Sequence, residues 1–333
     1  MTPAPKKICC RICGGTEATD WLHPREMMFG LREIFDYFRC AGCGCLQLDA
    51  VPADLGRHYP DNYYSYGNML DEPPSLWLAS KRKWFRPAML KHQLGWGGLM
   101  GRLLCVFKNG PEFPAWLRFL ERPVPLNSRV LDVGCGSGRN LLELRDCGFT
   151  NLLGADPFIK ESVTYPGDVQ VRKCRLEEVE GKFSLITFHH VFEHLENPVA
   201  TLQQARQKLT ADGQIMIRIP LSDSLAAEKY QENWVDLDAP RHITLQTRRS
   251  MEVLAQKAGM KIVRVSYDST EFQFLGSEQY LMNIPLVDPR SFFPEAKNNV
   301  FTAEQVTKFA AESAQLNAEQ QGDQAAFVLV ADQ

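Results

Sequence analysis

The chain lacks an excess of charge, a leader-like apolar segment and any long apolar run. Its 333 residues include 37 Lys and Arg against 40 Asp and Glu, so the net charge of −3 exerts no general attraction on nucleic acid or anionic membranes. The opening residues, MTPAPKKICC, have no apolar core of a signal peptide. The most apolar stretch, residues 94–107, is too short to span a bilayer and contains Arg102. We therefore expect a cytoplasmic protein without a transmembrane segment.

Cysteine, in contrast, is abundant, and six of the ten cysteines lie within the first 45 residues. In a chain expected to be intracellular, such cysteines favour metal binding over disulfides. Two C-x-x-C-G sequences, at Cys10 and Cys13 and at Cys40 and Cys43, can each place two thiolates on one side of a tight turn. Together they predict a closed tetrahedral site for a structural zinc ion. Cys9 replaces Cys10 if the register differs.

The charge of this zinc ribbon argues against a nucleic-acid partner. Residues 1–50 contain six Lys or Arg and six Asp or Glu, so no basic face follows a phosphate backbone. The alternative of a redox C-x-x-C pair requires a thioredoxin-like context, which is absent. We predict that the ribbon is a folding unit near the substrate side, and we do not expect nucleic acid as a partner.

The most informative segment is VLDVGCGSGRNLLEL, residues 130–144, which predicts a buried strand, a glycine-rich turn and the start of a helix. Gly134, Gly136 and Gly138 let the backbone approach a ligand closely, and their G-x-G-x-G spacing differs from the dinucleotide pattern G-x-G-x-x-G. Asp132 precedes the turn by two positions. A carboxylate there suits a ligand with a positively charged amine better than a pyrophosphate, because like charges repel.

The segments that follow alternate between strand and helix patterns, which predicts a doubly wound parallel sheet. Asp156 ends the second strand, 22 residues after Gly134, where a ribose-binding acid lies in a βαβ unit. The seven strands that we predict cover residues 130–133, 151–156, 169–174, 183–188, 213–219, 261–267 and 324–331.

These motifs resemble those of class I S-adenosylmethionine (SAM) dependent methyltransferases. The resemblance implies an α/β, seven-stranded Rossmann-like sheet that binds SAM, with Asp156 accepting hydrogen bonds from the ribose hydroxyls. By the same resemblance and by position, the candidate SAM-binding residues are Asp132, Gly134, Cys135, Gly136, Gly138, Asn140, Asp156, Pro157, Leu176, His189 and His190.

A second motif follows the fourth strand, where His190, Glu193 and His194 match the H-x-x-E-H pattern of inverted zinc proteases. That assignment needs the motif within a helix and a further ligand downstream. The segment instead follows a strand at the edge where α/β sheets bind ligands. Similar stretches occur there in the resembled methyltransferases, so we interpret it as a loop that lines the SAM pocket.

Four tyrosines lie within residues 58–66, and phenol rings with polar tips suit a sugar or another polar substrate. The order of zinc ribbon, tyrosine-rich segment and methyltransferase core resembles zinc-containing sugar methyltransferases, including deoxysugar 3-C-methyltransferases. We predict that Tyr64 helps to hold the acceptor. The alternative is rings that pack between domains. Basic residues of the following connector could meet substrate phosphates or anionic lipid, which leaves peripheral membrane contact open.

His242 is the candidate general base, because an imidazole with a pKa near neutrality can take a proton from an attacking hydroxyl or an enolisable carbon. The resembled sugar 3-C-methyltransferases have a Glu-His pair here, whereas this chain has Arg241 before His242. Arg241 could pair with a substrate phosphate or an inner acid. The alternative for His242 is a structural role that anchors the next helix.

Three regions are predicted: residues 1–66 form the ribbon and tyrosine-rich segment, 67–125 a helical connector, and 126–333 the methyltransferase domain, with a lid-like insert at about 268–322. The predicted function is SAM-dependent methylation of a sugar hydroxyl on a nucleotide sugar or surface glycan. The alternatives are a sugar C-methyltransferase, a nucleic-acid or protein methyltransferase guided by the ribbon, and a non-catalytic SAM-binding protein. The sequence does not predict an oligomeric state.

Overall fold

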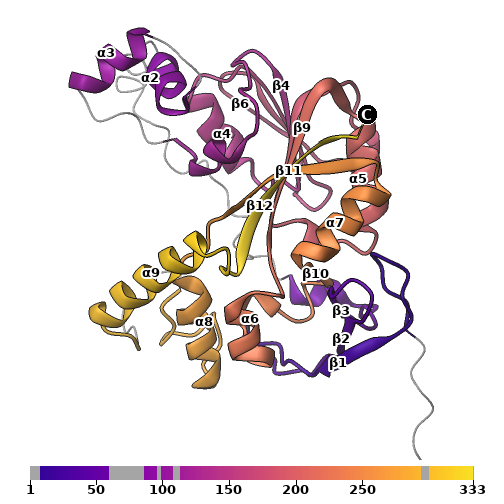
Figure 1. Cartoon of the computed structure of the whole chain (residues 1–333). Coiled ribbons are helices and arrows are strands. Elements are labelled where there is room, and N and C mark those ends of the chain that lie inside the picture. Colours follow the sequence, from indigo (N-terminus) through magenta and orange to yellow (C-terminus); the bar gives the residue numbers. More distant parts are fainter. Residues whose placement is uncertain (1–7, 60–85, 96–98, 108–112, 294–299, 333) are drawn as a thin grey trace, which may run out of the picture.

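The computed structural model describes residues 8–59, 86–95, 99–107, 113–293 and 300–332. Its centre is one eight-stranded sheet in the order β11-β12-β9-β8-β4-β5-β7-β6 (Figure 1). The strands, in chain order, are β4 (Arg129–Val133), β5 (Asn151–Ala155), β6 (Val163–Tyr165), β7 (Val169–Arg172), β8 (Phe183–His189), β9 (Leu209–Pro220), β11 (Met260–Tyr267) and β12 (Gln324–Ala331).

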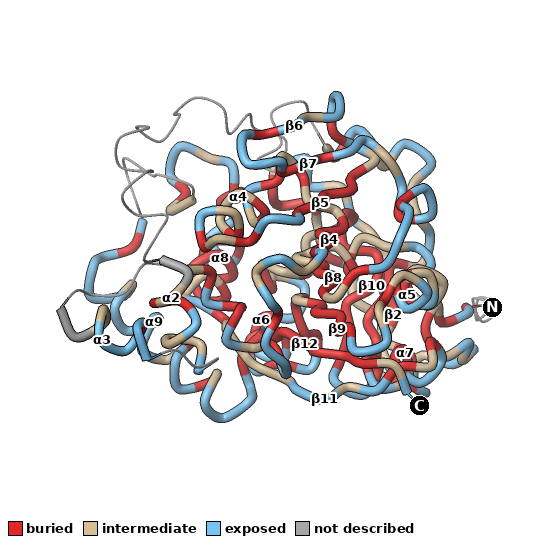
Figure 2. The backbone as a smooth tube through the Cα atoms, turned by 90° about the horizontal axis from the view of Figure 1, so that it is seen from above, coloured by how far each residue is buried: buried red, intermediate tan, exposed pale blue. Residues whose placement is uncertain are grey.

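The central strands are parallel and buried on both faces, which explains their nearly continuous apolar sequences. Helices α5 (Pro198–Gln207) and α7 (Arg248–Lys257) cover one face, and α4 (Arg139–Asp146) covers the other (Figure 1). The buried residues form a layer through the middle of the molecule (Figure 2). Strand β4 lies between β5 and β8, so the chain builds the sheet outward on one side of β4 and then crosses back to β8 on the other side. The crevice at its carboxyl end is where such sheets bind ligands.

The predicted doubly wound sheet is confirmed, with all seven predicted strands present within a few residues of their predicted ends. The structure adds the short strand β6, which pairs antiparallel with β7 at the edge. The sequence VTY is too short to stand out from a loop. Strand β9 also begins earlier than predicted, at Leu209, since Leu209 already pairs with Phe183 of β8 before a shift in register.

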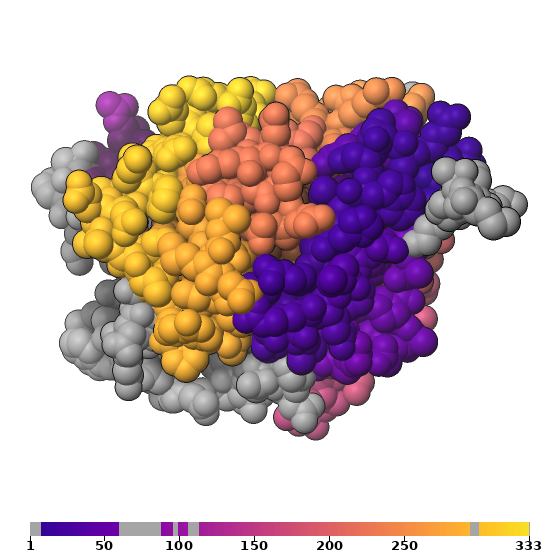
Figure 3. Space-filling model, turned by 90° about the horizontal axis from the view of Figure 1, so that it is seen from below, coloured from indigo at the N-terminus to yellow at the C-terminus, as the bar shows by residue number. Residues whose placement is uncertain are grey.

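The N-terminal module is built on β1 (Ala18–Leu22), β2 (Tyr37–Cys40) and β3 (Leu46–Leu48). A strand from the C-terminal half of the chain, β10 (Thr244–Leu245), continues this small sheet by pairing antiparallel with β3. The ribbon is therefore joined to the segment that carries His242. The space-filling view shows the N-terminal module lying beside the orange residues of the C-terminal half (Figure 3).

The remaining helices lie outside the central layers. In the predicted connector, the structure describes α2 (Arg86–Gln93) and α3 (Leu99–Phe107), followed by the short helix η3 (Ala115–Phe119). After α5, the chain forms α6 (Leu225–Tyr230), and the predicted insert contains α8 (Phe272–Leu281) and α9 (Ala303–Ala318). None of the described helices is long and apolar enough to cross a membrane.

The predicted alanine-rich helix is present as α9, and the Thr302 side chain caps it by accepting a hydrogen bond from the Gln305 amide. Most of α8 is buried, and its Phe274 stacks on Phe309 of α9 with ring centroids 5.2 Å apart. Helix α8 is therefore packed into the body of the protein in this structure. The lid-like movement of the insert stays a prediction.

Candidate functional site

The glycine-rich turn that follows β4 adopts backbone angles that favour glycine. Gly134, Gly136 and Gly138 have φ values of +68°, +52° and +89°. A Cβ on Gly134 would lie 2.5 Å from a methyl group of Val191, which belongs to the loop after β8. The turn and this loop therefore touch, and together they border the carboxyl end of β4.

Asp132 is buried at the end of β4, with 1% of its surface exposed. Its Oδ1 accepts a hydrogen bond of 2.7 Å from the Thr187 hydroxyl, while its Oδ2 has no partner among the described residues. Burial raises the pKa of Asp132 to about 7, although Thr187 and Asn140 both act to lower it. A buried carboxylate oxygen without a partner is unstable, and a ligand amine would supply the missing donor and charge.

Asp156 holds the turn from the neighbouring strand end. Its Oδ2 accepts a hydrogen bond of 2.9 Å from the Gly136 amide, and its Oδ1 accepts one of 2.8 Å from the Phe158 amide. Each carboxylate oxygen has a second lone pair, so both can still accept from ribose hydroxyls. The predicted pair of acids thus lies on either side of the glycine turn.

Other predicted cofactor residues occupy the same edge of the sheet. Gly138 precedes α4, Asn140 is the second residue of that helix, and Pro157 follows Asp156 directly. The thiol of Cys135 would meet a Cβ added to Gly154 on β5, so this side chain packs under the turn and faces the sheet. Leu176 is buried in the short helix η4 (Leu176–Glu178) after β7. Their contacts with SAM stay predictions.

The two adjacent histidines at the end of β8 have different surroundings. His189 meets the Trp116 ring edge-on, with centroids 4.9 Å apart, and burial lowers its pKa to about 3. Its Nε2 is buried without a partner among the described residues. The Nε2 of His190 accepts a hydrogen bond of 3.2 Å from Arg218, and its Nδ1 lies 3.2 Å from Glu193. A contact of either histidine with SAM stays a prediction.

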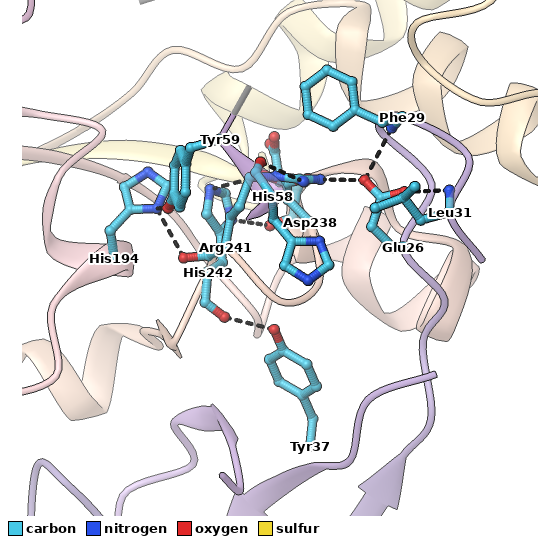
Figure 4. Close-up of polar contacts among 11 residues, drawn as sticks. Glu26, Phe29, Leu31, Tyr37, His58, Tyr59, His194, Asp238, Arg241 and His242 are labelled. Carbon is cyan, nitrogen blue, oxygen red and sulfur yellow. Dashed lines mark hydrogen bonds and ion pairs between the residues drawn. The ribbon is translucent and has the colours of Figure 1, made fainter. Parts of the chain in front are cut away.

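His242 lies in a cluster with His194 and Glu193. The two imidazole rings are 4.8 Å apart at 70°. The His242 Nδ1 lies 2.6 Å from the Asp236 carbonyl oxygen, which can only accept, so Nδ1 carries the hydrogen and Nε2 the lone pair. Burial, followed by the neighbouring His194, lowers the pKa of His242 to about 4. Figure 4 shows His194 and His242 near Tyr59.

Arg241 pairs with inner acids and is completely buried. Its guanidinium bonds Asp238 at 2.6 Å and Glu26 at 3.0 Å, as Figure 4 shows. Of the two partners that the sequence suggested, the inner acid is the one present. Glu26 also accepts hydrogen bonds from the amides of Phe29 and Leu31, so all its charge is compensated. This ion pair joins the N-terminal module to the loop before His242.

Sequence reasoning missed Glu26, Asp238 and Tyr59. The Tyr59 hydroxyl lies 3.2 Å from the His194 Nδ1. Asp238 precedes Arg241 by three residues, which is a signal for a local ion pair, whereas Glu26 carries no pattern that distinguishes it from a surface acid. Tyr64, which we predicted at the acceptor, lies outside the described residues.

The four predicted zinc ligands come together. The sulfur atoms of Cys10 and Cys43 are 3.5 Å apart, those of Cys13 and Cys40 are 3.4 Å apart, and all four lie within 4.8 Å of one another. A tetrahedral zinc ion with bonds of about 2.3 Å separates its sulfur ligands by about 3.8 Å, so the geometry fits. Amides of Ile12, Cys13 and Gly15 point at these sulfurs. Cys9 is exposed and outside this set.

One known family matches the part of the chain that holds most of the central sheet. Residues 111–265 match the family model described as "Methyltransferase domain". This part of the chain therefore resembles a methyltransferase domain. The match runs from β4 into β11, includes both histidine segments and the glycine turn, and agrees with the predicted fold and enzyme class. The N-terminal module and the C-terminal insert lie beyond it.

Among curated proteins, the chain is similar to proteins named "tRNA U34 carboxymethyltransferase". That of Shewanella sediminis is 27% identical over 52% of this chain and 56% of its own length, and that of Shewanella loihica is 25% identical over 56% and 64%. The chain therefore spans about half the length of these relatives.

Among solved structures, a cyclopropane synthase from Mycobacterium tuberculosis is 16% identical, covering 61% of this chain and 78% of its own, with a TM-score of 0.39. A SAM-dependent methyltransferase from Mesorhizobium loti is 14% identical, covering 62% and 93%, with a TM-score of 0.39.

Asp132 leads to a prediction about pH. Because its pKa is about 7 in the folded protein and 3.8 is the ordinary value, the folded state binds more protons between these limits. Its contribution to stability therefore falls as pH rises from about 4 to about 7, by roughly 1.4 kcal/mol for each pKa unit. Asp132→Asn should remove this dependence. Compared with the parent, the unliganded variant should therefore gain more stability at pH 8 than at pH 5. Urea unfolding at both pH values measures the difference.

The matched control is Asp212→Asn, because the Asp212 side chain is 99% exposed. This variant should keep the pH dependence of the parent. If Asp132→Asn kept it as well, Asp132 would already be ionised in the folded protein at pH 5.

Proposed function

We propose that this chain binds SAM at the end of β4 and transfers its methyl group to an acceptor. The main support is the buried Asp132 Oδ2, which has no partner among the described residues. Asp132 directly precedes the glycine turn, and Asp156 accepts a hydrogen bond from that turn on the other side. A carboxylate without a partner suits the cationic amine of SAM, and the second acid suits a ribose. The other predicted cofactor residues, among them Leu176, His189 and His190, surround the same edge.

The proposed acceptor is a hydroxyl, with a sugar on a nucleotide or glycan as the first candidate, and His242 as its general base. Support comes from the arrangement of His242, whose Nδ1 is bonded to the Asp236 carbonyl so that the Nε2 lone pair is available. The acceptor oxygen would lose its proton to Nε2 and attack the methyl carbon, and the carbon–sulfur electron pair would leave with S-adenosylhomocysteine. Alignment of the two reactants would supply most of the rate acceleration.

A nucleic-acid acceptor is the second candidate, since the relatives are named for tRNA U34. These names do not support the prediction that nucleic acid is not a partner. That prediction came from the even charge of residues 1–50, and a substrate can also be bound by groups outside the ribbon. Their printed name further speaks of a carboxymethyl group, which makes the transferred group itself part of the test.

Calorimetric titration with S-adenosylhomocysteine, beside a titration with NAD, tests the proposed cofactor. We expect only S-adenosylhomocysteine to bind. Asp156→Ala should weaken this binding at least tenfold, because it removes the proposed acceptor for the ribose hydroxyls and the acceptor of the Gly136 amide. Asp146→Ala, at the end of α4, is the control. Binding of NAD alone would overturn the assignment.

Acceptors are then compared by transfer of label from SAM to nucleotide sugars, a glycan and unmodified tRNA. Label in the sugar fractions supports the first candidate, and label in tRNA alone replaces it with the second. Binding of S-adenosylhomocysteine without transfer to any acceptor class would favour a non-catalytic SAM-binding protein.

A further inference from the structure

Three side chains from two separate loops direct metal-binding groups into one space. Glu193 and His194 belong to the short helix η5 (Phe192–His194) after β8, and His242 belongs to the loop before β10. One ligand atom of each lies within 4.8 Å of the others. A hydrogen bond of 2.6 Å from the Ile243 amide to the Glu193 carbonyl holds the two loops together. The arrangement is therefore fixed by backbone contacts.

Both imidazoles are oriented in the manner of metal ligands. The Nδ1 of His242 bonds the Asp236 carbonyl at 2.6 Å, and the Nδ1 of His194 bonds the Arg241 carbonyl at 2.9 Å. Since a carbonyl oxygen can only accept, each Nδ1 carries the hydrogen and each Nε2 keeps a lone pair. Metal-binding histidines commonly donate their other ring N–H to such a group, which fixes the tautomer and the ring orientation.

Glu193 supplies an independent observation, because it is only 1% exposed. Its Oε2 has no hydrogen-bond partner in the described part of the chain, and its Oε1 contacts the His190 Nδ1 at 3.2 Å without hydrogen-bonding geometry. Burying a carboxylate in this way is strongly unfavourable unless a cation or donors compensate it. Asp238 does not compete for His242, since its Oδ2 is 3.9 Å from the Nε2 and it is bonded to Arg241.

We infer that Glu193, His194 and His242 bind a divalent transition-metal cation that retains open coordination positions for the acceptor. Two imidazoles and one carboxylate are a ligand set of catalytic zinc and of non-haem iron sites, and three protein ligands leave room for a substrate oxygen. His194 is partly exposed, whereas Glu193 and His242 are buried, so the open side lies at His194.

The inference rests on the proposed function and changes the role of His242 within it. A cation occupies the Nε2 lone pair, so His242 acts as a ligand and the cation lowers the pKa of the bound hydroxyl. That hydroxyl releases its proton to water, its oxygen attacks the methyl carbon, and the carbon–sulfur electron pair leaves with S-adenosylhomocysteine. Oxygen-bearing acceptors such as vicinal diols or hydroxy acids can occupy two open positions at once.

The test adds Co²⁺ to the full chain with its cysteine site already loaded with zinc. We expect one further equivalent to bind, with the visible absorption of a nitrogen- and oxygen-ligated Co²⁺ and without the intense near-ultraviolet bands of thiolate ligation. Glu193→Gln and His194→Gln should each weaken this binding by at least about 10–100-fold, since they remove ligands themselves. Glu196→Gln, an exposed acid three residues along the same loop, should bind as the parent does.

Zinc content and far-ultraviolet circular dichroism report whether each variant is folded, so a folding failure in one leaves the other to decide. No further equivalent in the parent, or an equivalent that survives both substitutions, overturns the inference. These readouts need no SAM, so a failure here is separate from failure of the S-adenosylhomocysteine titration. A cation site without S-adenosylhomocysteine binding would overturn the proposed function and keep the metal site.

Discussion

Arg241→Met should lower the free energy of unfolding by about 3–5 kcal/mol, because it leaves two buried carboxylates without their shared cation. The Arg241 guanidinium bonds Asp238 at 2.6 Å and Glu26 at 3.0 Å, and both Arg241 and Glu26 are completely buried. Burial alone would lower the pKa of Arg241. With acids on both sides, the pKa of Arg241 is raised above its ordinary value, so the guanidinium stays charged.

Urea unfolding of the parent and of the variant measures this effect. Arg139→Met is the matched control, since Arg139 makes an exposed ion pair with Glu143 four residues away and should change stability by less than about 0.5 kcal/mol. Glu26→Gln should destabilise less than Arg241→Met, because Asp238 still pairs with the arginine. A loss below about 1 kcal/mol in Arg241→Met would show that water or another cation compensates the two acids.

The ion pair also bears on the site. Arg241 precedes His242, and its carbonyl accepts the hydrogen bond from the His194 Nδ1. If the pair fixes this loop, Arg241→Met should also weaken the binding of Co²⁺ at the proposed cation site, although it removes none of the three ligands. Unchanged affinity in a folded variant would limit the role of Arg241 to stability.

Local patterns predicted the central sheet well. The apolar strands, the glycine turn and the Thr302 cap each depend on interactions between residues that are close in the sequence, so short patterns can predict them. The C-x-x-C spacing likewise predicted the cluster of Cys10, Cys13, Cys40 and Cys43. Each half of the site is local in the sequence, and only the contact between the two halves is not. Strand β6 was missed because three residues carry too little periodicity.

Contacts between distant segments could not be predicted in this way. Glu26 and Arg241 are 215 residues apart, and Tyr59 and His194 are 135 apart. The H-x-x-E-H motif drew attention to His190, but the structure places His190 on Arg218 and brings His242 to Glu193 and His194 instead. The pairing of β10 with β3 is what joins these segments, and a two-residue strand has no signature in the sequence.

The second large effect concerns the cysteine site. Cys10→Ser should abolish zinc retention and unfold the N-terminal module, because the folding of small zinc modules draws on a metal-binding free energy of about 10–16 kcal/mol. Mass spectrometry of the metal content after dialysis against a weak chelator measures retention. Cys9→Ser is the control, since the neighbouring Cys9 is exposed and lies outside the sulfur cluster. Zinc lost in Cys9→Ser and kept in Cys10→Ser would establish the other register.

Loss of zinc should also destabilise β10 and the segments beside it, because these contact the N-terminal module directly. The Cys43 carbonyl accepts a hydrogen bond of 3.0 Å from the Thr247 hydroxyl, and the Tyr37 hydroxyl donates one of 2.7 Å to the His242 carbonyl. Without the ribbon, β10 also loses β3 as its partner. Hydrogen exchange of the β10 amides should therefore accelerate in Cys10→Ser, while the β4 amides, which pair only within the central sheet, stay protected. Equal acceleration in both strands would mean that the ribbon and the domain unfold as one unit.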